Sequence, residues 1–232
     1  SKKVLSGGKV EFTIRNQKGY AVADTDCGTN AKVSEDNKTI LIENVLKDMV
    51  CTVRFGSNKY TITLNGNGTP NVVYMKYSNG FYSDANTTKL LRKISVLPTK
   101  TGYTFQGYKY NTTQVINNTG AIVADNTFVD SNVTLDPEFA PNTAKYTYGC
   151  SSEVTTCTYD NDCSIKGSIC SKDGYTHTGW KDQTGKTYNP NENVKNYVSE
   201  NDIIINLSPL YSPKTYTVSF NANGGSVSQT SK

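Results

Sequence analysis

The sequence predicts a mainly β protein made of small modules that follow one another in a string. Short stretches alternate polar residues with β-branched or aromatic ones, and clusters rich in Asn and Gly separate them. Only 35% of the 232 residues are hydrophobic and 19% are charged, which favours several thin cores over one thick core. Two motifs also return at one fixed spacing. Together these observations predict a mainly β fold with small α+β modules.

The alternating stretches predict the strands in chain order. They are residues 10–14, 38–42, 51–55, 60–64 and 216–220. Turns are expected directly after two of them, at residues 65–68 and 221–225, because Asn tolerates a left-handed backbone and Gly carries no side chain. Only residues 83–95 and 191–198 predict short helices. No apolar run approaches the ~20 residues of a membrane helix, so we expect no membrane segment.

Internal repeats divide the chain. The sequence GYTFQGY at residues 102–108 returns 72 residues later as GYTHTGW, and LDPEFAP at residues 135–141 returns at the same spacing as LSPLYSP. The stretch YTITLNGNG at residues 60–68 reappears as YTVSFNANG. We therefore expect four parts: a small β unit at residues 1–57, modules at 58–142 and 143–213, and the first strand of a further repeat at 214–232.

Aromatic residues of the repeated motifs predict the module cores. The expected core residues are Tyr103, Phe105, Tyr108 and Phe139 in the first module and Tyr175, His177, Trp180 and Tyr211 in the second. One aromatic side chain buries on the order of 150–250 Å², so a few of them dominate so small a core.

In chain order, the motifs Y-T-x-x-F-N-x-N-G-G, P-T-x-x-G-Y-T-F-x-G-Y/W and a closing L-x-x-x-aromatic resemble the internalin-type B repeat. That repeat is a small β-grasp-like module found in strings on bacterial cell-surface proteins. The resemblance covers roughly residues 58–225 and implies the same fold and setting here. Phe139 and Tyr211 stand where that family has Trp. Residues 1–57 look like a divergent relative, through Gly19, Tyr20 and Cys27.

Six cysteines predict disulfide bonds, because no C-x₂₋₄-C knuckle of a zinc site occurs. Cys27 and Cys51 are the expected pair of the first unit. In the middle module, we favour a nested pairing, Cys157–Cys163 within Cys150–Cys170, because residues 157–163 form a compact polar turn. The adjacent pairing, Cys150–Cys157 with Cys163–Cys170, stays open. Disulfides imply an oxidising location outside the cytosol.

Few residues are suited to catalysis or metal binding. His177 is the only histidine, and its repeat counterpart is Phe105, which indicates a packing position. Two acidic pairs offer oxygen ligands for calcium but lack further carboxylates, and we interpret them as solvated turns. These pairs are Asp24 with Asp26 and Asp160 with Asp162. We expect no enzyme, no catalytic residue, no cofactor and no metal.

The function expected is that of a non-enzymatic, modular, extracellular surface protein, either a stalk or spacer or an adhesin. Its net charge of +4 is dispersed, which argues against a nucleic-acid partner. An adhesin would bind an unknown protein or glycan ligand on a host or neighbouring cell. Two alternatives stay open. One is a subunit of a pilus-like filament that self-associates by strand addition, and the other is a carbohydrate-binding module.

Overall fold

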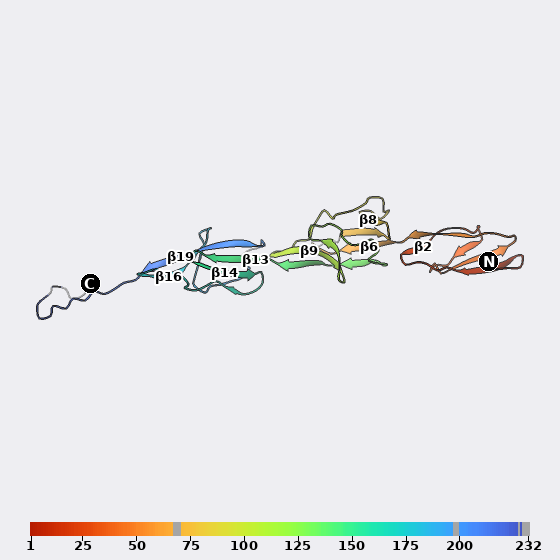
Figure 1. Cartoon of the computed structure of the whole chain (residues 1–232). Helices are drawn as coiled ribbons and strands as arrows, with labels where there is room; N and C mark the ends of the chain where they lie inside the picture. The colour runs from red at the N-terminus through yellow and green to blue at the C-terminus, as the bar shows by residue number, and fades with distance from the viewer. Residues whose placement is uncertain (67–70, 197–199, 227, 229–232) are drawn as a thin grey trace. The chain divides into compact units, whose positions relative to one another are not determined.

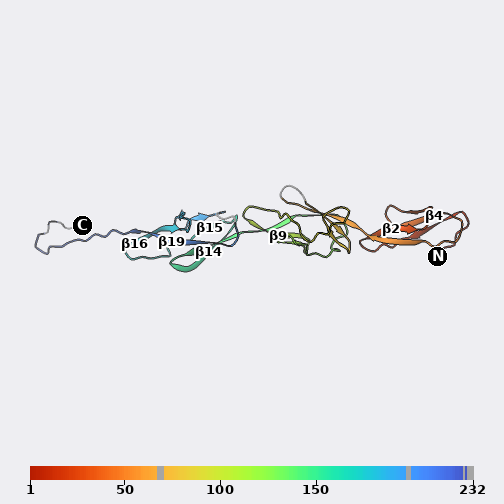
Figure 2. The ribbon, with the colours of Figure 1, turned by 90° about the horizontal axis from the view of Figure 1, so that it is seen from above.

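A computed structural model describes residues 1–66, 71–196, 200–226 and 228. Every regular element within these ranges is a β-strand, and none is a helix, as the arrows of Figures 1 and 2 show. The mainly β fold is therefore confirmed. The chain divides into two compact units. The first comprises Ser1–Thr99 and Phe105–Phe139, and the second Lys100–Thr104 and Ala140–Lys232.

The N-terminal part of the first unit holds five strands. They are β1 (Gly8–Thr13), β2 (Tyr20–Asp26), β3 (Ala31–Val33), β4 (Thr39–Val45) and β5 (Thr52–Ser57). One antiparallel sheet has the order β1-β4-β3, and β2 pairs with β5 in a second. Because side chains alternate between the faces of a strand, β4 points Ile40 and Ile42 into the core, where they lie with Cys27.

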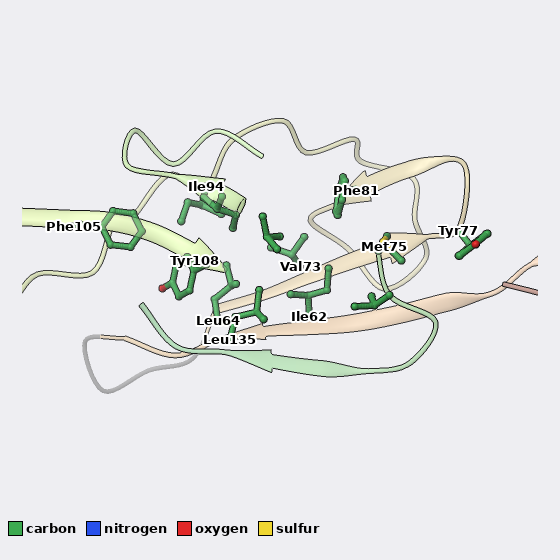
Figure 3. Packing of buried hydrophobic residues seen from close by; sticks show 13 residues of the cluster. Ile62, Leu64, Val73, Met75, Tyr77, Phe81, Ile94, Phe105, Tyr108 and Leu135 are labelled. Carbon is green, nitrogen blue, oxygen red and sulfur yellow. The ribbon is translucent and has the colours of Figure 1, made fainter. Parts of the chain in front are cut away.

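Seven further strands lie between residues 59 and 141. They are β6 (Lys59–Leu64), β7 (Asn71–Lys76), β8 (Gly80–Tyr82), β9 (Tyr103–Tyr110), β10 (Thr113–Asn117), β11 (Val133–Leu135) and β12 (Pro137–Pro141). They form two sheets, β11-β6-β7-β8 and β10-β9-β12. Figure 3 shows how side chains of β6, β7, β9 and β11 point toward one another, among them Ile62, Met75 and Leu135. Met75 is fully buried.

The second unit has one main sheet, β14-β13-β19-β16-β17. Its strands are β13 (Thr143–Tyr148), β14 (Ser151–Thr158), β15 (Cys163–Ser164), β16 (Tyr175–Lys181), β17 (Thr187–Tyr188), β18 (Asn193–Val194) and β19 (Ile203–Pro213). The pair β15-β18 forms a separate ribbon. Trp180, Tyr146, Ile165 and Leu207 are the most deeply buried side chains of this core.

The two expected helices are wrong. Residues 83–95 form turns and isolated bridges, because the Asp84 carboxylate accepts hydrogen bonds from the backbone nitrogens of Thr88 (3.1 Å) and Lys89 (2.7 Å) and so replaces helical bonding. In the second stretch, Asn191 and Asn196 have positive φ angles of 61° and 52°, and β18 lies between them. Residues 197–199 lie outside the described residues.

The expected strand at residues 216–220 is also wrong, since only Ser219 makes a β-bridge there. Its counterpart β6 pairs with β7 on one side and β11 on the other. No strand flanks residues 216–220 in the described part of the chain. A turn does follow at Asn223 and Gly224, with φ angles of 43° and 98°. The other expected turn, at residues 65–68, falls partly on residues 67–70, outside the described residues.

Candidate functional site

Phe105 is the centre of an aromatic cluster in the first unit. Its ring centroid lies 5.4 Å from that of Tyr108 and 6.0 Å from that of Phe139, both edge to face. Phe105 and Tyr108 are buried, and Phe139 is half-buried. The Tyr108 hydroxyl donates a hydrogen bond to the Asn65 carbonyl oxygen (2.7 Å). Burial of the ring raises the pKa of Tyr108. The cluster is therefore a packed core and not an open ligand site.

His177 occupies the corresponding position in the second unit. Its ring lies 4.6 Å from that of Trp180 and 5.8 Å from that of Tyr211, so the arrangement around Phe105 is repeated. Trp180 is fully buried, and its indole nitrogen donates a hydrogen bond to the Lys166 carbonyl oxygen (2.8 Å). Tyr211 also contacts Tyr175 edge to face (6.4 Å). The repeated geometry places His177 among packing residues.

The imidazole of His177 has few polar partners. Its Nδ1 lies 3.2 Å from the Ser168 hydroxyl, whereas Nε2 is buried and has no hydrogen-bond partner in the described part of the chain. Burial lowers the pKa of His177 below its usual 6.5, although a backbone hydrogen bond with Gly179 acts in the opposite direction. A serine beside a histidine resembles two members of a catalytic triad, but among the described residues no carboxylate bonds to Nε2 of this imidazole.

A turn with the sequence Asp/Asn-x-Thr-Gly occurs in both units, and the sequence analysis missed it. Asp182 accepts hydrogen bonds from the Thr184 nitrogen (2.8 Å), the Thr184 hydroxyl (2.7 Å) and the Lys186 nitrogen (3.0 Å). Asn117 binds the equivalent three groups of residues 119 and 121. The signal is visible as NNTG and DQTG. Burial by itself raises the pKa of Asp182, but the hydrogen bonds, including one from Tyr188 (2.9 Å), lower it to about 2.

Gly-Tyr corners are a further shared feature. Gly19 has a φ of 78°, and a Cβ atom there would lie 2.2 Å from the ring of Tyr77. The Tyr20 ring meets the Tyr77 ring edge to face at 5.8 Å. In the second unit, Gly102 has a φ of 75° and the ring of Tyr159 in the same position, again at 2.2 Å. Only glycine admits a ring at these corners.

Three disulfide bonds join the six cysteines. Cys27–Cys51 joins the end of β2 to the start of β5, which are paired strands of one sheet. The second unit has the nested arrangement, Cys157–Cys163 within Cys150–Cys170, and not the adjacent one. Cys27 and Cys170 are buried, so these bonds supplement thin hydrophobic cores.

The acidic pairs bind protein groups. Asp24 forms an ion pair with Arg54 (2.8 Å), and Asp162 forms one with Lys195 (3.2 Å). Asp160 accepts hydrogen bonds from the Tyr103 hydroxyl (2.7 Å) and the Asn196 amide (2.9 Å). The Tyr103 bond lowers the pKa of Asp160 and raises the pKa of Tyr103. Within the described ranges, no three His, Cys, Asp or Glu side chains are grouped to hold a metal ion.

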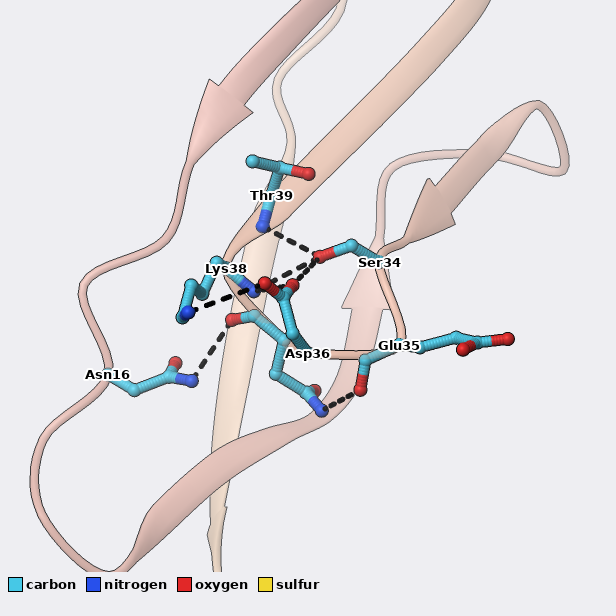
Figure 4. Close-up of polar contacts among 7 residues, drawn as sticks. Asn16, Ser34, Glu35, Asp36, Lys38 and Thr39 are labelled. Atoms are coloured by element: carbon cyan, nitrogen blue, oxygen red, sulfur yellow. Dashed lines mark hydrogen bonds and ion pairs between the residues drawn. The ribbon is translucent and has the colours of Figure 1, made fainter.

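The turn before β4 satisfies its own polar groups (Figure 4). The Ser34 hydroxyl donates to the Asp36 carboxylate (2.6 Å) and accepts from the backbone nitrogens of Lys38 (3.1 Å) and Thr39 (2.9 Å). The hydrogen bond from Ser34 and one from the Lys38 nitrogen lower the pKa of Asp36. The polar groups of this cluster therefore bond to one another, as is typical of a structural turn.

An apolar groove of about 1040 Å³ opens in the N-terminal part of the first unit. Its walls include Phe12 of β1 and Ile40 of β4, and Lys2, Lys3 and Lys47 also line it. Near the groove, Leu46 and Val50 are 68% and 86% exposed. This part of the unit therefore leaves apolar surface uncovered.

The comparison with known families concerns residues 216–232. These residues match the Listeria-Bacteroides repeat domain, a bacterial surface repeat. The match supports a bacterial surface repeat in general, and it does not extend to the narrower internalin-type B repeat. No curated protein matches the chain. The match and the three disulfides indicate an extracellular or cell-surface protein. No helix of the described residues is long and apolar enough to cross a membrane.

Proposed function

We propose that this chain is a non-enzymatic stalk or spacer whose repeats carry tension along an extracellular surface protein. One observation carries the proposal: in each repeat the first strand has a parallel neighbour from the end of the repeat. These pairs are β6 with β11, which β12 follows directly along the chain, and β13 with β19. Force that enters at the start of the first strand and leaves at the end of the last one pulls the two strands in opposite directions. All hydrogen bonds between them are then loaded together.

In the first unit, β6 pairs with β11 from Ile62↔Val133 to Leu64↔Leu135. Further hydrogen bonds extend this pairing beyond both ends. The Thr61 nitrogen donates to the Asn132 side chain (2.8 Å), and the Asn65 nitrogen donates to the Leu135 carbonyl oxygen (2.9 Å). The loaded segment is therefore longer than the strand pair itself.

The second unit repeats this arrangement with five residue pairs, from Ala144↔Ile203 to Tyr148↔Leu207. The Gly149 nitrogen donates to the Leu207 carbonyl oxygen (2.8 Å), as Asn65 does to Leu135. The Thr147 hydroxyl also donates to the Asn206 side chain across the pair (2.7 Å). Leu135 and Leu207 are the same position of the sequence repeat.

Single-molecule stretching of the oxidised chain tests the proposal. Residues 1–57 serve as an internal comparator, because their first and last strands, β1 and β5, lie in different sheets. We expect two ruptures at higher force than that of this segment. The repeat with no disulfide should release roughly 80 residues, or about 280 Å, and the other roughly 50, or about 170 Å, because Cys150–Cys170 withholds the intervening chain.

Reduction provides the matched control for this assignment. The shorter release should lengthen by roughly 20 residues, or about 70 Å, once the Cys150–Cys170 bond is open. The change Thr147→Val keeps the shape of the side chain and removes the hydrogen bond to Asn206. It should lower the rupture force of the second repeat and leave that of the first unchanged. Repeats that rupture at or below the force of residues 1–57 would refute the proposal.

A second candidate function, a filament subunit that assembles by strand addition, is favoured by one pair of features. Tyr216, Val218 and Phe220 alternate along the chain and are 69%, 57% and 55% exposed, and the apolar groove beside β1 and β4 is uncovered. Light scattering over a concentration series should then show assembly that Val218→Asp abolishes. A monomer at every concentration rejects this function.

A further inference from the structure

The chain has three Gly-Tyr corners with the same backbone. They are Gly19-Tyr20, Gly102-Tyr103 and Gly174-Tyr175, with glycine φ angles of 78°, 75° and 78°. In each corner the tyrosine nitrogen donates to the carbonyl oxygen three residues earlier, at distances of 3.0 to 3.1 Å. The glycine carbonyl oxygen in turn accepts a hydrogen bond, from the nitrogen of residue 58, 142 or 214, at distances of 2.8 to 2.9 Å.

Two of the corners hold a tyrosine ring against the glycine. The ring belongs to Tyr77 at the first corner and to Tyr159 at the second. The backbone places both in one way, since the nitrogen of Tyr77 donates to the Asn58 carbonyl oxygen (3.0 Å) and that of Tyr159 to the Asn142 carbonyl oxygen (2.8 Å). The edge-to-face contact with the corner tyrosine is also the same, 5.8 Å and 5.7 Å.

The third corner has the same parts and no ring. Around Gly174, no heavy atom of the described chain, its chain neighbours apart, lies within 4 Å of the position that a Cβ would take. Gly19 and Gly102 are buried, whereas Gly174 is half-exposed. The Lys172 ammonium lies over the Tyr175 ring (3.9 Å), as Lys100 lies over the Tyr103 ring at the occupied corner (3.7 Å). The corner is therefore already formed without an occupant.

We propose that the corner of Gly174 and Tyr175 is a binding site for a tyrosine side chain, presented by a further repeat of the kind that starts near Tyr216. The nitrogen of Lys214 already bonds the Gly174 carbonyl oxygen (2.8 Å), as Asn142 bonds Gly102. The match of residues 216–232 to a repeat domain makes such a repeat the fitting source of the ring. This site is independent of the tension proposal, which rests on β13 and β19.

NMR titration of the ¹⁵N-labelled full chain with N-acetyl-L-tyrosinamide tests the site. The amide signals of Gly174 and Tyr175 should shift saturably with a Kd on the order of 1 mM, as a ligand of this size allows. The signals of Gly19 and Gly102 should not move, because their corners are filled. N-acetyl-L-leucinamide, which has no ring, is the ligand control and should give no saturable shift.

Two variants separate this site from adventitious binding. Gly174→Ala places a methyl group where the ring would lie and should abolish the shifts. Because alanine is strained at a φ of 78°, Tyr175→Leu is the second variant; it keeps the backbone and should weaken binding roughly 2- to 12-fold through loss of the edge-to-face contact. The proposal is overturned by no saturable shift up to about 50 mM, by equal shifts at Gly102, or by shifts that persist in both variants.

Discussion

Replacement of the only histidine, His177→Phe, is expected to stabilise the second unit. Phe105 occupies the same repeat position, and its contacts with Tyr108 and Phe139 match those of His177 with Trp180 and Tyr211. A phenyl ring therefore fits the site without new packing.

The expected gain follows from the polar atoms of the imidazole. A buried polar atom without a partner costs roughly 1–3 kcal/mol, and His177 Nε2 is such an atom. The lost hydrogen bond to Ser168 costs about 0.5–1.5 kcal/mol at most, because that exposed hydroxyl then binds water. The net effect is a stabilisation of about 1 kcal/mol, which raises the Tm by about 4–8 °C for a unit of this size.

The pH dependence of stability provides an independent test of the buried imidazole. Since burial lowers the pKa of His177 below 6.5, the unfolded chain binds more protons than the folded chain once the pH falls below about 6.5. The natural protein should therefore lose stability in that range as the pH falls, and His177→Phe should lack this loss. Above about pH 7.5 the wild-type imidazole is neutral in the folded and in the unfolded chain, so the two proteins differ in stability only through packing and hydrogen bonds.

Calorimetric melting between about pH 8 and about pH 5 measures both effects. The reciprocal change Phe105→His is the matched control and should destabilise the first unit, because it buries an imidazole in an apolar cluster. A lower Tm for His177→Phe near neutral pH would refute the packing argument. A wild-type acid slope that persists in His177→Phe would refute the titration argument.

Three further changes test other features of the fold. Gly102→Ala and Gly174→Ala carry the same backbone strain, but only the first meets a tyrosine ring, so its Tm should fall further; equal losses would contradict the ring contact. Asp182→Asn should keep its turn at neutral pH and remove the loss of stability that the wild type shows as the pH falls from about 4 to about 2, measured by acid titration of near-UV circular dichroism. Opening the Cys150–Cys170 bond by serine substitution should cost about 3 kcal/mol and opening Cys157–Cys163 about 2, because the first closes the longer loop; denaturant titration would show the reverse order if strain decided the effect.

Four of the five strands predicted from alternation are present, because alternation reports a local property, the face on which each side chain lies. Residues 60–64 alternate, and β6 buries Ile62 and Leu64 on one face. The helices failed for an equally local reason that the periodicity does not report. Asp84 binds the backbone ahead of it, and a residue that does so starts a turn rather than a helix.

The sequence did not predict which strands pair with one another. Alternation does not indicate that β6 pairs in parallel with β11. The paired residues Ile62 and Val133 are 71 residues apart along the chain. Residues 216–220 show the limit most clearly, because they alternate as β6 does and still form no strand. Strand formation depends on partners, and those partners are separated from the strand along the chain.

The two repeats share some structural features and differ in others. Both keep the parallel pairing that ends at Leu135 and Leu207, and both keep the Gly-Tyr corner. Two details differ, since Phe105 is exchanged for His177 and disulfides occur in the second repeat only. The proposed stalk function rests on the shared parallel pairing, and the proposed tyrosine site rests on the shared Gly-Tyr corner, so both proposals use features that the two repeats have in common.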